Sequence, residues 1–105
     1  MDKSIYLDKA ANGHNWLHTE SRREAKRLGR LLSFRHGFFR WGIYVPAITD
    51  EAIYPNYVRG RLKIYAGWDN WVGYDFLAAN SQTDEFLEQF IARHITEIRD
   101  VRTGT

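Results

Sequence analysis

The chain has 105 residues, of which 44% are apolar and 15% aromatic, so it can bury a core and is too rich in aromatic residues for a disordered protein. It has no cysteine, which excludes disulfides, thiolate zinc sites, iron–sulfur clusters and a cysteine nucleophile. The formal net charge is +2, but residues 1–47 carry a balance of +5 and residues 48–105 one of −3. This asymmetry indicates a charged partner rather than a particular fold.

The first predicted helix covers residues 21–34. Residues before it are compatible with a short strand at 5–7 and a turn at 11–13, and Trp16 and Leu17 are expected to reach the core. Ser21 followed three residues later by Glu24 forms a capping box. The apolar stripe of the helix consists of Ala25, Leu28, Leu31 and Leu32, and Gly37 is a typical stop signal. The opposite side carries five cations, namely Arg22, Arg23, Lys26, Arg27 and Arg30.

Three strands are expected in the middle of the chain. Residues 38–45 alternate between two faces, which is typical of a strand, and Pro46 ends the pattern. Residues 46–56 are expected to form a loop, and residues 57–66 a second strand in which Gly60 marks a bulge. A tight turn at 67–70 then leads into a third strand at 71–78, so the second and third strands form a hairpin.

A second helix is predicted over residues 83–95. Ser81 or Thr83 can cap it, and the acidic residues of its first turn suit the positive end of the helix. Residues 96–101 either extend this helix or form a short strand, and we favour the strand. The order predicts an α+β fold, in which an antiparallel sheet of three or four strands packs against two helices. The face of the sheet without helices is expected to carry Arg40, Tyr44, Arg61, Lys63 and Tyr65.

Length leaves little room for a second domain, so we expect one domain over residues 1–105. No apolar run approaches the roughly 20 residues that cross a bilayer. The first residues also lack the long apolar stretch of a signal peptide. The sequence therefore predicts a cytoplasmic protein without membrane contact.

The predicted hairpin is the first candidate binding site. It concentrates large aromatic and acidic side chains around one turn, and exposed Trp and Tyr are typical anchors of protein interfaces. The candidate partner-binding residues are Trp68, Asp69, Asn70, Trp71, Tyr74 and Asp75. The alternative is a hairpin tip whose aromatic side chains cap the core and whose Asp69 and Asn70 only form the turn.

The basic face of the first helix is the second candidate. Four of its five cations are Arg, which holds phosphate or carboxylate bidentately. A nucleic-acid-binding module using this face together with Arg40, Arg61, Lys63 and Tyr65 is therefore an alternative function. The other interpretation is a solvated face that keeps the protein soluble.

Enzyme and metal signatures are absent from the sequence. It has no dinucleotide-binding, Walker, nucleophile-elbow or zinc-protease motif. His14 and His18 would share a face only in a helix, which Gly13 opposes, so no metal ligand set is predicted. A small nuclease using His14, His18, His36 and Lys9 remains a third alternative, without any characteristic spacing. We expect no catalytic residues, no cofactor and no small-molecule substrate.

Residues 64–74, followed by Phe76, Leu77 and the helix from Asp84, resemble small bacterial immunity proteins. These inhibitors are encoded beside polymorphic or contact-dependent growth inhibition toxins. The resemblance implies a non-enzymatic cytoplasmic protein that binds one cognate toxin domain tightly. Inhibitors of nucleic-acid-cleaving toxins are often strongly acidic, whereas this chain is slightly basic. Either the toxin is not strongly basic, or the acidic C-terminal half makes the contact.

Overall fold

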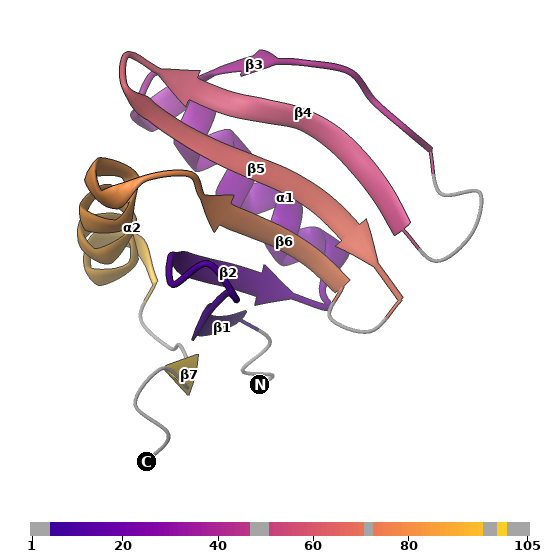
Figure 1. Cartoon of the computed structure of the whole chain (residues 1–105), viewed down its shortest axis with the longest axis horizontal. Helices are drawn as coiled ribbons and strands as arrows, with labels where there is room; N and C mark the ends of the chain where they lie inside the picture. The colour runs from indigo at the N-terminus through magenta and orange to yellow at the C-terminus, as the bar shows by residue number, and fades with distance from the viewer. Residues whose placement is uncertain (1–4, 47–50, 71–72, 96–98, 101–105) are drawn as a thin grey trace.

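One sheet organises the protein (Figure 1). The computed structural model describes residues 5–46, 51–70, 73–95 and 99–100. Within these residues the sheet has seven strands in the order β3-β4-β5-β6-β2-β1-β7. The strands are β1 (Ile5–Lys9), β2 (Asn15–Thr19), β3 (Phe39–Trp41), β4 (Glu51–Arg59), β5 (Leu62–Asp69), β6 (Gly73–Ala78) and β7 (Arg99–Asp100). The first six pair antiparallel, and β7 pairs parallel with β1.

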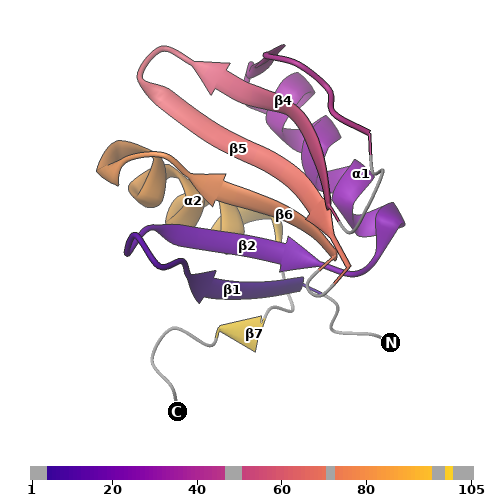
Figure 2. The ribbon, with the colours of Figure 1, turned by 45° about the vertical axis from the view of Figure 1, so that its right-hand side comes forward.

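Two helices cover one face of this sheet (Figures 1 and 2). Helix α1 (Arg22–Arg30) continues into a π-helical turn, η1 (Leu31–Arg35), and α2 spans Ser81–His94. The prediction of an α+β fold with two helices is confirmed. No helix of the part of the chain that the structure describes lies over the opposite face of the sheet (Figures 1 and 2), and we call this face the open face. No helix of the described residues is long and apolar enough to cross a membrane.

The core lies between the helices and the sheet. Strand alternation places Leu17, Ile64 and Phe76 on the helix side, where each is buried. They pack in one cluster with Leu28 and Leu32 of the first helical segment and with Leu87, Phe90 and Ile91 of α2. Leu17 is therefore in the core as expected. Trp16 is only partly buried and alternates to the open face.

Side-chain caps fix the beginnings of both helices. The predicted cap at Ser21 is confirmed, because its hydroxyl accepts a hydrogen bond from the Glu24 amide. The other half of the capping box is wrong, because the Ser21 amide donates to Thr19 Oγ1 and the Glu24 carboxylate pairs with Arg27. Helix α2 begins two residues earlier than predicted, and its cap is Asn80 rather than Ser81 or Thr83. The buried Thr83 instead accepts from the Lys63 amide and donates to Asn80, which holds the start of α2 against β5.

The prediction of three or four strands is wrong, because the central hairpin was misplaced. The predicted loop 46–56 contains the first six of the nine residues of β4, which begins at Glu51. Gly60 is not a bulge inside one strand but part of the turn between β4 and β5, with a positive φ of 59°. Strand β5 also runs through the predicted turn at 67–70 as far as Asp69, and residues 71–72 lie outside the described residues.

The two ends of the chain add further strands to the sheet. Strand β1 includes the expected residues 5–7, and β2 pairs with both β1 and β6. The favoured strand at 96–101 is found as β7 at Arg99–Asp100, while residues 96–98 and 101 lie outside the described residues. The predicted strand 38–45 is shorter than expected, since regular pairing covers only Phe39–Trp41 and a single bridge joins Val45 to Ile53.

Candidate functional site

The six residues predicted to bind a partner do not form one surface. Trp68 pairs with Tyr74 on the helix side of the sheet, whereas Asp69 and Asp75 alternate to the open face. Asn70 is exposed in the turn after β5. Trp71 lies outside the described residues. Strand alternation thus turns the Trp68 and Tyr74 side chains away from the carboxylates next to them in sequence, although Trp68, Asp69 and Asp75 all line one groove.

The open face carries large apolar side chains in solvent. Phe39 and Trp41 on the edge strand β3 are 55% and 68% exposed, and Ile53 and Tyr65 on the adjacent strands are 51% and 42% exposed. Their positions in the register place all four opposite the core. Exposed apolar side chains gathered on one face are typical of protein interaction sites.

Carboxylates lie directly beside these apolar groups. A groove of about 290 Å³ on the open face is lined by Ile53 and Tyr65 together with Glu51, Asp69 and Asp75. We define the open-face patch as Phe39, Trp41, Ile53 and Tyr65 with Glu51, Asp69 and Asp75. Of this set, the sequence had pointed to Asp69 and Asp75 as partner-binding residues and to Tyr65 on the helix-free face. The pairing of four strands assembles the rest.

Asp75 is the most strongly perturbed carboxyl group of the patch. Burial raises its pKa from 3.8 to about 6, although a hydrogen bond from the Trp16 side chain opposes the shift. The nearby Asp69 and Glu51 carboxylates raise the pKa further. A cationic group of a partner would relieve this repulsion, so the patch is suited to a basic surface.

His18 lies beside Asp75 in the register of β2 and β6. Its ring stacks against Tyr6 and contacts Trp16. Burial lowers its pKa, while Asp8, at 3.9 Å from Nε2, raises it. The buried Nε2 makes no hydrogen bond within the described residues. His18 and Asp75 are thus cross-strand neighbours on the open face, and both are partly buried.

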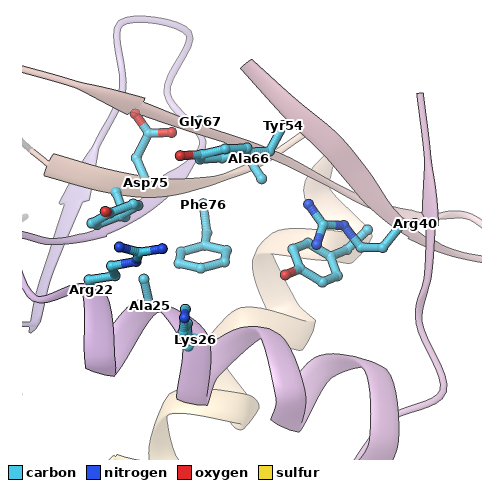
Figure 3. Close-up of a pocket in the computed structure, with 11 residues that line it drawn as sticks. Arg22, Ala25, Lys26, Arg40, Tyr54, Ala66, Gly67, Asp75 and Phe76 are labelled. Atoms are coloured by element: carbon cyan, nitrogen blue, oxygen red, sulfur yellow. The ribbon is translucent and has the colours of Figure 1, made fainter. Parts of the chain in front are cut away.

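On the helix side, a cleft of about 480 Å³ lies between α1 and the strands β4, β5 and β6 (Figure 3). Arg22 and Lys26 line it from α1, and Arg40 lines it from β3. The aromatic rings of Tyr54, Tyr57, Tyr74 and Phe76 form much of its remaining wall. We call this the cationic cleft, and the predicted basic helix face contributes only part of it.

The five cations of α1 divide between different surroundings. Arg22 and Lys26 line the cationic cleft, and Arg30 lines a second hollow of about 290 Å³ that shares Lys26, Arg40 and Tyr57 with it. Arg27 instead forms an ion pair with Glu24 within the helix, at 2.9 Å. Arg23 is exposed and lines neither hollow. The predicted basic face is therefore two surfaces rather than one.

The residues expected together on the helix-free face also divide. The prediction is wrong for Arg40, which pairs with Tyr57 on the helix side, and for Tyr44, which stacks on Tyr54 there with the ring centroids 5.5 Å apart. Lys63 and Tyr65 do lie on the open face, where the ammonium group contacts the Tyr65 ring. Arg61 is exposed at the turn between β4 and β5.

The histidines occupy separate places. His14 hydrogen-bonds Asp84 of α2 at 2.7 Å, whereas His18 lies near the open-face patch. His36 and His94 share a hydrogen bond of 2.8 Å between their Nε2 atoms. Within the described residues, no three His, Asp or Glu side chains are grouped as metal ligands. The residues of the nuclease alternative are thus not brought together.

Neither the open-face groove nor the cationic cleft is evident from the spacing of residues in the sequence. Ile53 falls in a stretch expected to be a loop, and the cationic cleft combines residues from positions 22 to 76. The only local signal is the alternation around Phe39 and Trp41, which sets them apart from Arg40. Comparison of the chain with protein-family models, with curated proteins and with solved structures finds no match.

Proposed function

We propose that this protein is a non-enzymatic inhibitor of the immunity type, which binds a cognate toxin domain through the open-face patch. The observation that carries the proposal is the group of exposed Phe39, Trp41, Ile53 and Tyr65 on one side of the sheet. Leaving such side chains in water is unfavourable, and a partner that covers them gains the free energy of their burial.

The charge of the patch indicates the kind of partner. Glu51, Asp69 and Asp75 line the same groove as Ile53 and Tyr65, so the apolar centre has an acidic border. All three carboxylates belong to the acidic half of the chain, residues 48–105. A basic toxin surface fits this border, which reconciles an inhibitor of a basic protein with a formal net charge of +2. The inhibitor acts in the cytoplasm of the cell that it protects.

The position of the patch at the edge of the sheet favours tight binding of a partner. Phe39 and Trp41 belong to β3, which is the edge strand of the sheet. An edge strand offers backbone hydrogen-bonding groups beside these side chains, and partners use such edges to extend a sheet. Interfaces of this kind bury roughly 800 Å² on each partner and depend on a few aromatic anchors. We assign the anchor role to Trp41.

The test is co-expression with the toxin-like proteins encoded beside the gene, scored by growth and by co-purification after nuclease treatment. The wild-type chain should restore growth and form a complex with one of them. Trp41→Ala and Ile53→Ala should each weaken this complex about tenfold or more, because removing a buried anchor costs about 2 kcal/mol.

Phe34→Ala is the matched control, because Phe34 is 83% exposed and lies on the helix side, outside the patch. It should bind and protect as well as the wild type. Failure of the wild-type chain to protect against any neighbouring toxin would contradict the proposal. So would a Phe34→Ala variant that loses as much affinity as Trp41→Ala.

A further inference from the structure

The cationic cleft gathers positive charge without a matching negative charge. Arg22 and Lys26 extend from α1 toward the strands, and Arg40 approaches from the opposite end (Figure 3). Asp75 is the one carboxylate among the described residues that line the cleft, and its side chain points away toward the open face. None of these three cations forms an ion pair with a carboxylate within the described residues. The cleft is therefore suited to an anionic ligand, whose negative charge would balance these cations.

Arg40 is held in place before any ligand arrives. Its Nε and Nη2 donate to the Pro55 carbonyl oxygen at 3.0 and 2.7 Å. Its guanidinium group also lies 4.1 Å from the centroid of the Tyr57 ring. The hydrogen bonds to Pro55 do not use Nη1. A guanidinium group that is already oriented loses less conformational entropy when it binds an oxyanion.

Aromatic rings supply the other half of the site. Tyr54 lines the cleft, and its ring stacks on Tyr44 outside the cleft with an interplanar angle of 4°. Small residues line the cleft from both sides, with Ala25 on α1 and Ala66 and Gly67 on β5 (Figure 3). Burial and the neighbouring tyrosines raise the pKa of Tyr54, so its hydroxyl stays protonated and can donate a hydrogen bond.

We propose that the cationic cleft binds a nucleotide, whose phosphate groups are held by Arg22, Lys26 and Arg40 and whose base packs against the tyrosine rings. A cleft of about 480 Å³ falls within the usual range of small-ligand sites, about 300–1,000 Å³. Planar rings pack on tyrosine regardless of base identity, and phosphate is the anion that Arg binds bidentately. This site shares Ala66, Gly67 and Asp75 with the lining of the open-face groove but none of its three cations, and its test needs no toxin.

The bound nucleotide is either a free nucleotide or one unit of a single-stranded nucleic acid. The second hollow continues the cleft along α1 past Arg30 and Phe34, which leaves room for a strand to pass. Titration calorimetry with ADP, pyrophosphate and a short oligouridylate distinguishes these two forms. Binding of ADP identifies a free nucleotide. Binding of the oligouridylate without ADP identifies a strand. Either result supports the proposal, provided that it depends on the cleft residues.

Two variants and a control define that dependence. Lys26→Gln and Arg40→Gln should each weaken binding about tenfold or more, as expected for the loss of a charge-assisted hydrogen bond. Arg23→Gln makes the same charge change as Arg40→Gln but outside the cleft, and it should leave affinity within about twofold of wild type. Lys26 is exposed, so Lys26→Gln should keep the wild-type unfolding temperature, whereas Arg40→Gln also loses the contacts with Pro55 and Tyr57 and should lower it.

A separate comparison of two ligands tests the role of the tyrosine rings. ADP should bind more tightly than pyrophosphate, and Tyr54→Leu should remove that difference while leaving pyrophosphate binding unchanged. Three results would overturn the proposal: no binding of ADP or oligouridylate, binding that Lys26→Gln and Arg40→Gln leave intact, or an equal loss in Arg23→Gln. The last result would indicate general attraction to a basic surface.

Discussion

The surroundings of Asp75 on the open face determine how readily its carboxyl group loses its proton. Its carboxyl group is desolvated between β5 and β2 and lies near two further carboxylates, Asp69 and Glu51. Trp16 donates a hydrogen bond to it, which only partly offsets the burial of charge. The group is therefore more costly to ionise in the folded chain than in the unfolded chain.

This shift has a definite sign for stability. Because the pKa of Asp75 is raised from 3.8 to about 6, the folded protein binds more protons than the unfolded chain between these values. The contribution of Asp75 to the free energy of unfolding therefore falls as pH rises from about 4 to about 6. A shift of this size corresponds to at most about 3 kcal/mol.

We predict that Asp75→Asn raises the free energy of unfolding at pH 7 by about 1 to 3 kcal/mol and leaves it unchanged at pH 3. The asparagine oxygen can still accept from Trp16, so the local contact is retained. Denaturant unfolding at a series of pH values measures the difference between variant and wild type. The difference at pH 3, where the Asp75 carboxyl group is protonated, serves as the control. A constant difference for Asp75→Asn would show that burial does not shift this group.

At the scale of elements, the close approach of α1 to β4 depends on one glycine. A Cβ atom on Gly29 would collide with the Tyr57 hydroxyl, and Tyr57 is itself buried at 5% exposure. Alanine normally favours a helix over glycine by about 1 kcal/mol, so only packing can make it unfavourable here. Gly29 thus sets the distance between the first helix and the strand that forms the cleft wall.

We predict that Gly29→Ala destabilises the protein by about 1 to 2 kcal/mol, because overpacking exceeds the gain in helix propensity. Tyr57→Phe removes the hydroxyl that causes the collision. In the Tyr57→Phe background, Gly29→Ala should therefore be neutral or stabilising. A double-mutant cycle of unfolding free energies measures this coupling. Equal effects of Gly29→Ala in both backgrounds would show that Tyr57 is not the obstacle.

The helices were predictable because their signals are local. The Ser21 cap and the apolar stripes lie within a few turns of one another in sequence. The β4–β5 hairpin was misread because its turn at Gly60 and Arg61 has two residues. Apolar residues therefore continue at every second position from Val58 through Leu62 to Ile64, as in one unbroken strand. The pattern gives the period of the strands but not where the chain reverses.

For the molecule as a whole, neighbours in sequence point to opposite surfaces. Trp68 and Asp69 were predicted as one site, yet consecutive residues of a strand face opposite sides of the sheet. The basic and acidic halves of the sequence are likewise sorted, since Arg22, Lys26 and Arg40 line the helix-side cleft while Glu51, Asp69 and Asp75 line the open-face groove. Composition indicated this charge asymmetry, but only strand pairing assigns its two parts to two faces.

The open-face patch and the cationic cleft lie on opposite sides of the same strands, β4, β5 and β6. Whether binding at one site affects binding at the other therefore depends on the whole sheet. Ile53 on the open face and Lys26 at the cleft have no common contact surface, because Lys26 lines only helix-side hollows and Ile53 only the open-face groove. We predict that Ile53→Ala changes ADP affinity, and Lys26→Gln changes toxin affinity, by less than about 0.5 kcal/mol each. Calorimetry of each ligand with both single variants and the double variant measures the coupling. A larger coupling would mean that the sheet transmits ligand binding from one face to the other, and that the nucleotide regulates the inhibitor.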